Sequence, residues 1–222
     1  MRRAALAGLL LLVTACGGSE PPHARAPLRA GESYGIDVSN HQGRIDWDRV
    51  ADDRTAFAYV KASEGGDFAD KRFDDNWAGA DDAGLRRGAY HFFTLCRHGA
   101  EQAANFLRAA PPDDDALPPA VDLELAGNCT TRPGRAAVLA ELDAFLGRIE
   151  QAWGRRALLY VGRDWEQTYP VLGRSDRPRW LVSYPERPAQ GWTVWQLHGH
   201  ARVHGVTGPV DLDVARLADL DG

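Results

Sequence analysis

Short apolar runs rich in β-branched and aromatic residues alternate with longer amphipathic segments along most of the chain. This alternation is typical of strand–helix units built around a parallel sheet. The apolar runs predict eight strands, at residues 34–39, 56–62, 88–93, 120–125, 157–161, 180–184, 193–197 and 210–214. The amphipathic segments predict helices at residues 47–53, 72–83, 100–109, 135–153 and 165–169.

Each of the first five predicted strands is followed by a helix, whereas only loops join the last three. This order predicts an α/β fold with an irregular TIM-like barrel. An open, doubly wound sheet is the alternative, but the first strand is not followed by the glycine-rich loop that binds phosphate groups in such sheets. A chain of 222 residues that is 44% hydrophobic can bury a sizeable core in one domain.

The beginning of the chain resembles an export signal. Arg2 and Arg3 precede an apolar run at residues 4–13, which is too short to cross a membrane comfortably as a helix. The run ends in Val-Thr-Ala-Cys, which resembles the lipobox of bacterial lipoproteins. We therefore expect a signal peptide at residues 1–15 and a lipid on Cys16. The alternative is an ordinary secretory signal in which Cys16 carries no lipid.

The segment after Cys16 is rich in glycine, proline and alanine and has no periodic apolar pattern. It predicts a flexible tether at residues 16–32, followed by a barrel domain at residues 33–222. The protein is then expected outside the cytoplasm, held to a membrane through the lipid on Cys16. Gly17 is not the aspartate that commonly retains lipoproteins at the inner membrane, which favours the outer membrane or the cell surface.

Charge excludes one class of partner. The formal net charge is −5, and the chain has no long basic run. Basic side chains supply most of the affinity for nucleic acid, so we expect no nucleic-acid partner. We expect the protein to be a monomer.

The three cysteines predict a disulfide. If Cys16 carries lipid, Cys96 and Cys129 are an even set in an oxidising compartment, where pairing is favoured. The alternative is two unpaired thiols in the core.

Acidic residues interrupt three of the predicted apolar strands: Asp37 in the first, Asp122 and Glu124 in the fourth, and Asp211 with Asp213 in the last. In barrels of this type, catalytic groups lie at the carboxyl ends of the strands. Burying an acid in an apolar strand is costly, so these residues are the candidates for chemistry.

Asp122 and Glu124 are the most informative pair. Residues two apart in a strand point to the same face, with Cα atoms about 6.5–7 Å apart. Two carboxyl groups that close do not both ionise easily, so one holds its proton while the other is an anion. Glycoside cleavage requires this combination. The alternative is that both acids form ion pairs with nearby arginines.

Five motifs in order carry a family resemblance. They are Gly-Ile-Asp-Val-Ser at 35–39 with Gln-Gly at 42–43, Tyr-Val-Lys-Ala-Ser-Glu-Gly at 59–65, Gly-Ala-Tyr-His-Phe at 88–92, Asp-Leu-Glu at 122–124, and Trp-Gln at 195–196 followed by Val-Asp at 210–211. With these motifs the chain resembles the glycoside hydrolase family 25 lysozymes, the Chalaropsis-type N-acetylmuramidases. The resemblance implies an irregular (β/α)5β3 barrel. It also implies hydrolysis of the β-1,4 bond between N-acetylmuramic acid and N-acetylglucosamine in bacterial peptidoglycan.

The resemblance also implies roles for four acids. Glu124 is expected to be the proton donor and Asp122 the assisting carboxylate, with Asp37 and Asp211 lining the same site. It implies retention of the anomeric configuration, with either Asp122 or the substrate's acetamido group as the nucleophile. No cofactor and no metal are needed for either route.

Aromatic side chains near the predicted strand ends are candidates for stacking on sugar rings: Tyr90, Tyr160, Tyr184 and Trp195. The alternative for each of them is packing inside the barrel.

Three polar residues are further candidates for substrate contact. Lys61 and Glu64 lie near the end of the second predicted strand, and a structural ion pair between them is the alternative. Gln196 could donate a hydrogen bond to a sugar or orient one of the acids.

Two rival functions and one rival site remain. The protein could be a noncatalytic glycan-binding barrel, or it could hydrolyse another N-acetylated glycan such as chitin. The presence of all four acids argues against a noncatalytic barrel. His198, His200 and His204 lie close together in sequence, but they lack helical i, i+4 spacing, so we do not expect a zinc site.

Overall fold

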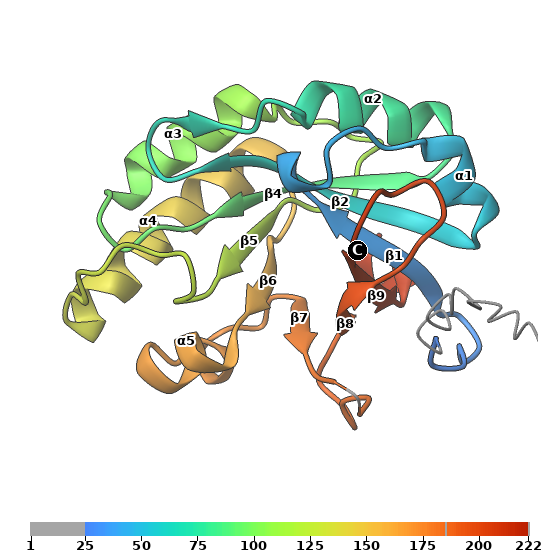
Figure 1. Cartoon of the computed structure of the whole chain (residues 1–222). Coiled ribbons are helices and arrows are strands. Elements are labelled where there is room, and N and C mark those ends of the chain that lie inside the picture. Colours follow the sequence, from blue (N-terminus) through green and yellow to red (C-terminus); the bar gives the residue numbers. More distant parts are fainter. Residues whose placement is uncertain (1–24, 185, 222) are drawn as a thin grey trace, which may run out of the picture.

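The computed structural model describes residues 25–184 and 186–221 and forms one closed barrel with helices on its outside (Figure 1). Eight strands close the barrel: β1 (Ser33–Val38), β2 (Thr55–Glu64), β4 (Arg86–Phe92), β5 (Ala120–Leu123), β6 (Leu158–Val161), β7 (Arg179–Val182), β8 (Val194–Ala201) and β9 (Val210–Ala215). Each strand pairs with the next, and β1 pairs with both β9 and β2, which closes the sheet. The alternative of an open, doubly wound sheet is therefore wrong.

Strand direction divides the barrel. Among the eight barrel strands, every pair from β1 to β8 is parallel, whereas β9 is antiparallel to both β8 and β1. The carboxyl ends of β1 to β8 therefore open at one end of the barrel, which we call the mouth. The chain of β9 runs the other way, from the mouth toward the opposite end, which we call the floor.

In the described part of the chain, five α-helices lie on the outside of the barrel: α1 (Trp47–Asp52), α2 (Phe73–Asp82), α3 (Gly99–Ala109), α4 (Arg135–Trp153) and α5 (Arg163–Thr168). Local signals agree with their ends. Asp46 caps α1 by accepting a hydrogen bond from the backbone N–H of Arg49, and α4 ends at Gly154 with φ of 64°, the left-handed conformation that glycine adopts readily.

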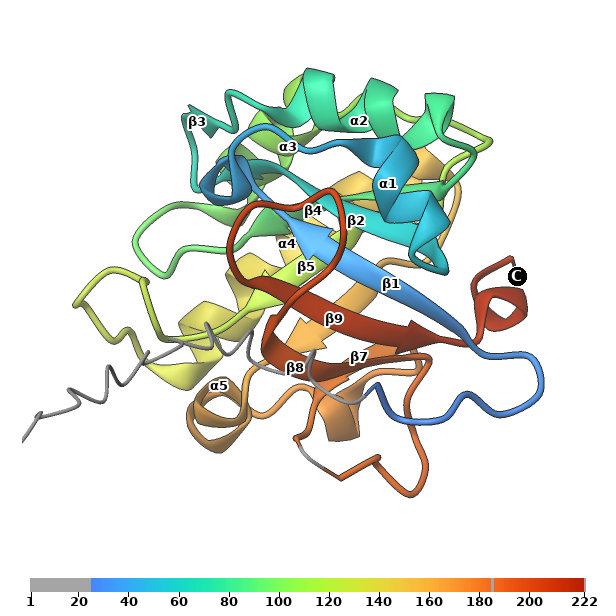
Figure 2. The same cartoon turned by 45° about the vertical axis from the view of Figure 1, so that its right-hand side comes forward.

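The last part of the barrel has no helix to cover it. Among the described residues, the segments from β7 to β9 contain no α-helix, and Figure 2 shows β1, β9 and β8 side by side on this face. Three short 3₁₀ helices complete the described secondary structure: η1 (Asn40–Gln42), η2 (Leu172–Arg174) and η3 (Leu217–Leu220).

Two apolar layers hold the barrel together. The larger layer lies between the strands and the helices, and a smaller one fills the barrel interior with rings such as Phe57, Tyr59 and Trp180. Glycines make room for these rings, because a Cβ on Gly35 would lie 2.3 Å from the Phe57 ring and one on Gly88 would lie 2.3 Å from the Tyr59 ring. These packed rings fill the barrel interior below the mouth.

The predicted elements agree with the observed ones, with small differences. Each of the eight predicted strands is present, and the mixed α/β barrel is confirmed. The short strand β3 (Phe68–Ala69), which pairs antiparallel with the end of β2, was not predicted. The predicted strand at 120–125 ends at Leu123, so Glu124 lies just beyond the strand.

The predicted signal peptide, Cys16 and residues 16–24 of the predicted tether lie outside the described residues. The rest of the predicted tether, residues 25–32, contacts the floor end of the barrel. Arg25 forms an ion pair with Asp53 at 2.7 Å, and Glu32 forms an ion pair with Arg187. None of the helices within 25–184 and 186–221 is both long and apolar enough to cross a membrane.

Candidate active site

Four acids predicted from the sequence gather at the mouth of the barrel. Asp37, Asp122, Glu124 and Asp211 line a cavity of about 110 Å³ and also a wider, adjoining cavity of about 390 Å³. Asp37 lies near the carboxyl end of β1, Asp122 lies in β5, and Asp211 lies near the start of β9, opposite Asp37 in the strand register. The barrel thus brings together acids that are up to 174 residues apart in the chain.

The loop after β5 holds Glu124 in place. The side-chain N–H of Asn128 donates to the carbonyl oxygens of Glu124 (3.0 Å) and Phe93 (2.9 Å), and its oxygen accepts from the backbone N–H of Leu95 at 2.9 Å. A disulfide between Cys96 and Cys129, with Cα atoms 6.3 Å apart, joins the same two loops. The predicted disulfide is confirmed. The disulfide and the Asn128 hydrogen bonds connect the loop that follows Glu124 to the loop that follows β4.

The acids hold their protons more tightly than free carboxyl groups do. Burial raises the pKa of Asp122 well above its ordinary value, and the charges of Glu124 and Asp37 raise it further, while Lys61 lowers it. Burial also raises the pKa of Glu124, with a further increase from Asp164 and a decrease from Lys61.

Asp211 has the same behaviour. Burial, followed by the charges of Asp37 and Glu124, raises its pKa to about 9. A crowded, desolvated acid cluster of this kind keeps protons at neutral pH, so a carboxylic acid is available as a proton donor.

Lys61 and Glu64 lie in the wider cavity and form an ion pair with each other at 2.7 Å. The ion pair that was the alternative from the sequence is therefore present, and the two residues lie beside the acids. The ammonium group of Lys61 also lies 4.9 Å from the centre of the Phe92 ring. Lys61 supplies positive charge that favours ionisation of Asp122 and Glu124.

Three of the four predicted aromatic residues lie at the site. Tyr90 and Tyr160 line the smaller cavity. Tyr184 is 50% exposed, and its ring lies 6.4 Å from that of His198. The hydroxyl of Tyr184 and Oδ1 of Asp211 both approach Gly199, each 3.5 Å from where a Cβ would be, so Tyr184 lies at the rim beside the acids.

Trp195 does not reach the cavity, and its predicted sugar contact is corrected. Its side chain is fully buried in the outer apolar layer, where its ring N–H donates to the carbonyl oxygen of Ser183 at 2.6 Å. Side chains alternate along a strand, so Trp195 points outward from β8 while the next residue, Gln196, points into the barrel. Trp180 of β7 lines the cavity instead.

Trp180 was not chosen from the sequence, and Asp213 was noted as an acid in an apolar strand but was given no role in the site. The indole N–H of Trp180 donates to Oδ1 of Asp213 at 2.9 Å, and Asp213 is completely buried. Beside them, Tyr160 donates to Oε1 of Gln196 at 3.1 Å, and Nε2 of Gln196 donates to Oδ2 of Asp37 at 3.3 Å. The i, i+2 spacing of Asp211 and Asp213 was the available sequence signal.

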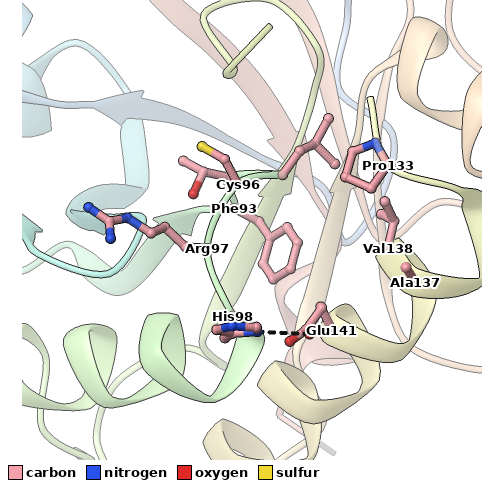
Figure 3. Close-up of a pocket in the computed structure, with 10 residues that line it drawn as sticks. Phe93, Cys96, Arg97, His98, Pro133, Ala137, Val138 and Glu141 are labelled. Atoms are coloured by element: carbon pink, nitrogen blue, oxygen red, sulfur yellow. Dashed lines mark hydrogen bonds and ion pairs between the residues drawn. The ribbon is translucent and has the colours of Figure 1, made fainter. Parts of the chain in front are cut away.

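A separate cavity of about 250 Å³ lies between the loop after β4 and the start of α4 (Figure 3). Its walls include Phe93, Pro133 and Val138, and its one carboxylate, Glu141, accepts from the backbone N–H of Gly99 at 2.7 Å and contacts His98 at 3.1 Å. A single engaged carboxylate does not provide the paired acid and base of the mouth, so this cavity is not the catalytic candidate.

The histidines near the end of β8 make local contacts. The backbone N–H of His200 donates to Nδ1 of His198 at 3.0 Å, and the backbone N–H of His204 donates to Asp53 at 2.9 Å. Within the two described ranges, no group of three or more His, Cys, Asp or Glu side chains is placed to hold a metal ion.

Comparison with known proteins agrees with this geometry. Residues 36–206 match the family described as Glycosyl hydrolases family 25. The uncharacterized protein YegX of Escherichia coli K12 is 33% identical over 190 residues, covering 82% of this chain and 68% of that protein. Lysozyme M1 of Streptomyces globisporus is 33% identical over 200 residues, covering 83% of this chain and 68% of that protein.

Solved structures show the same barrel. A family 25 glycosyl hydrolase from Bacillus anthracis matches with a TM-score of 0.79 at 31% identity, covering 90% of this chain and 94% of that chain. The family match, the sequence relatives and the shared barrel agree with one another. The chain therefore belongs to glycosyl hydrolases family 25.

Proposed function

We propose that the protein is a lysozyme, an N-acetylmuramidase that hydrolyses the β-1,4 bond between N-acetylmuramic acid and N-acetylglucosamine in bacterial peptidoglycan. The observation that carries this proposal is the pair of desolvated carboxyl groups, Asp122 and Glu124, at the mouth of a family 25 barrel. The relative named Lysozyme M1 supports the choice of substrate.

In the proposed reaction Glu124 is the acid. Its raised pKa keeps the carboxyl group protonated, so it donates that proton to the glycosidic oxygen as the bond to the anomeric carbon breaks. Asp122 lines the same cavity and, as an anion, stabilises the positive charge that develops at the anomeric carbon. Burial and the charge of Glu124 oppose this anionic form of Asp122, whereas Lys61 favours it.

Completion of the reaction returns the proton. As the leaving sugar departs, either Asp122 or the oxygen of the substrate's acetamido group bonds to the anomeric carbon. A water molecule then attacks that carbon and breaks this bond, and Glu124, now a carboxylate, accepts the proton of that water. Retention follows whether Asp122 attacks directly or orients the substrate's acetamido group for attack. Asp37 and Asp211 are proposed to complete the acid cluster around the reacting sugar.

Substrate contact is proposed for the side chains that line or border the two cavities: Tyr90, Tyr160, Tyr184, Gln196, Lys61 and Glu64. Aromatic rings offer flat apolar faces to the C–H surface of a pyranose, and the polar groups bind its hydroxyls. The barrel itself is proposed to have the (β/α)5β3 arrangement, which the placement of α1 to α5 after the first five parallel strands of the barrel supports.

We also propose that the protein is an exported lipoprotein and a monomer, with a signal peptide at residues 1–15, a lipid on Cys16 and a tether that leads to the barrel. The lipobox-like sequence before Cys16 supports the lipid. Cys16→Ser is expected to move the protein from the membrane fraction to the soluble fraction. Retention of Cys16→Ser in the membrane fraction would contradict a lipid on this residue.

The enzymatic proposal is tested with purified peptidoglycan and a soluble form of the protein, residues 17–222. Wild type is expected to release fragments that end in reducing N-acetylmuramic acid, identified by mass spectrometry. Glu124→Gln is expected to release none, whereas Glu101→Gln, which changes an exposed glutamate of α3, retains the activity.

Other results would change the function. Binding to peptidoglycan without cleavage by wild type would favour a noncatalytic glycan-binding barrel. Cleavage of chitin, with intact peptidoglycan, would favour a hydrolase of another N-acetylated glycan.

A further inference from the structure

Asp213 lies beneath the acid cluster, in a place where an ionised carboxylate is costly. It is 0% exposed, and it faces Gly35 of β1 and Gln196 of β8 in the strand register. Because β9 runs from the mouth toward the floor, Asp213 is one layer deeper than Asp211 on the same face of the strand. An acid buried at this depth requires partners that compensate for lost hydration.

In the described part of the chain, the hydrogen-bond donors around Asp213 and Asp37 leave one carboxyl oxygen, Oδ2 of Asp213, without a donor. Trp180 donates to Oδ1 of Asp213, and Gln196 donates to Oδ2 of Asp37. The amide of Gln196 is oriented by Tyr160, whose hydroxyl donates to its oxygen. Oδ2 of Asp213 is buried and meets no N–H or hydroxyl donor among the described residues.

The side chains of Asp37 and Asp213 lie on the inward faces of the adjacent strands β1 and β9, where their carboxyl groups approach each other. Two carboxylate anions have no hydrogen to place between them, so this contact requires one proton for the pair. Within the described part of the chain, no basic side chain forms an ion pair with Asp37 or Asp213, so no cation replaces that proton.

We propose that Asp213 is a positioning residue for Asp37: the two carboxyl groups share one proton, which keeps Asp37 neutral and directs it toward the catalytic cavity. The negative charge of the pair then resides on Asp213, below the cavity, where Trp180 stabilises it. The effect on catalysis rests on the proposed function, whereas the shared proton does not.

The shared proton matters because of the charge on neighbouring Asp122. An ionised Asp37 raises the proton affinity of Asp122, which works against the anion required there. Placing the charge on Asp213 moves it away from the reacting sugar. Burial raises the pKa of both acids, with a further increase from the charge of Asp213 on Asp37 and from the charge of Asp211 on Asp213. The contact between the two carboxyl groups raises the pKa of Asp37 and lowers that of Asp213, as expected if the shared proton is on Asp37.

Other groups also face this pair, and each of them is part of the pH response. They are Tyr59 of β2, Tyr90 of β4, Asp122 and Glu124 at the end of β5, Tyr160 of β6, Trp180 of β7, Gln196 of β8 and Asp211 of β9. Lys61, the nearby cation, acts on Asp122 and Glu124 and pairs with Glu64.

The test follows the side-chain carboxyl carbon of Asp37 by NMR in protein labelled with 13C-aspartate, with the resonance assigned by Asp37→Asn. In wild type we expect Asp37 to be protonated at neutral pH. In Asp213→Asn the new amide donates to Asp37, and the second acid is gone, so the titration of Asp37 is expected to move to lower pH. Asp219→Asn, a control at an exposed aspartate of η3, is expected to leave it unchanged.

A second measurement reports on the reaction. In Asp213→Asn the ionised Asp37 opposes ionisation of Asp122, so the acidic limb of the kcat/KM profile is expected to move to higher pH. Asp219→Asn is expected to keep the wild-type profile. A merely structural role for Asp213 would lower activity at all pH values without moving this limb.

The outcomes are separable. An Asp37 resonance that is already ionised at neutral pH in wild type, or that titrates identically in Asp213→Asn, would overturn the shared proton even if the enzyme is active. If wild type cleaves no glycan, the NMR titration still shows whether Asp37 and Asp213 share a proton. If Asp213→Asn does not fold, Trp180→Phe replaces it: loss of the donor to Asp213 is expected to raise the pH at which the pair loses its proton, and an unchanged titration would overturn the proposal.

Discussion

The strands β5 and β9 carry the same acidic pattern and use it in different ways. In each case two acids lie two residues apart: Asp122 in β5 with Glu124 just beyond the end of that strand, and Asp211 with Asp213 in β9. On β5 the chain runs toward the mouth, so the second acid, Glu124, reaches the cavity. On β9 the chain runs toward the floor, so the second acid, Asp213, is completely buried. Strand direction therefore decides whether the second acid of a pair lies at the cavity or is buried below it.

The largest expected effect is a loss of kcat that differs between Glu124 and Asp213, the second acids of the two pairs. Glu124→Gln removes the proposed proton donor and is expected to lower kcat by about 10²–10⁴-fold, the usual contribution of a general acid. Asp213→Asn is expected to lower kcat by about tenfold or less at the pH optimum, because it acts through Asp37. Steady-state rates on soluble glycan fragments measure both. Equal losses from the two substitutions would remove the distinction between the pairs.

The disulfide joins the loop after the β5 pair to the loop after β4. Replacing both Cys96 and Cys129 with serine opens a covalent loop with a sequence separation of 33. Loop entropy predicts a loss of about 3–4 kcal/mol in the free energy of unfolding, measured with urea. Because the loop after Glu124 is released, kcat is expected to fall as well, while the Asp37 titration stays the same. A change in that titration would show that the β9 pair also depends on the disulfide.

Stability is expected to fall as pH rises from about 6.5 to about 9. An acid whose folded pKa lies above its unfolded value binds more protons in the folded state, so its contribution is full below the unfolded pKa and is lost as pH approaches the folded pKa. Asp211, with a pKa of about 9, sets the upper end of this range. Buried His91 explains the lower end of this range. Its pKa is lowered to about 3, so its contribution to protein stability is lost only as pH falls below about 6.5, the ordinary pKa of histidine.

Urea unfolding at several pH values measures this slope. Asp211→Asn is expected to flatten it by up to about 1.4 kcal/mol per pH unit, the limit for one proton. An increase in stability between pH 6.5 and 9 would contradict the proposed protonation of the cluster.

The smallest expected effect concerns the charge beside Glu124. Asp164, at the start of α5, raises the pKa of Glu124, so Asp164→Asn is expected to lower that pKa. The basic limb of the kcat profile then moves to lower pH, while the acidic limb stays in place. Asp219→Asn is the matched control. A basic limb that stays in place in Asp164→Asn would assign that limb to another acid, with Asp211 the next candidate.

Much of the fold was predictable because the apolar runs are short and well separated. Buried parallel strands are continuous apolar runs, and the helices between them have one apolar face, so both are visible in the sequence. The short strand β3 was missed because two exposed residues carry no periodic signal. The exact end of β5 was also missed, since its pattern continues through Leu125.

The site was predictable where acids interrupt apolar strands. Asp37, Asp122, Glu124 and Asp211 stand out for this reason, and the structure brings all four to one cavity. For Trp195 and Trp180 the sequence did not predict which side chain lines the cavity. Both are buried aromatic residues on strands, and only the face on which each side chain lies separates a packing residue from a cavity wall.

The sequence by itself determined the strand and helix order, the family, the acids available for catalysis and the cysteines that pair. Only the tertiary structure decided the depth of each acid, because depth depends on the direction of a strand within the closed barrel. Asp213 was therefore visible as an acid but not as a buried partner of Asp37. Its partner is 176 residues away in the chain, and no local pattern records a contact that closure of the sheet creates.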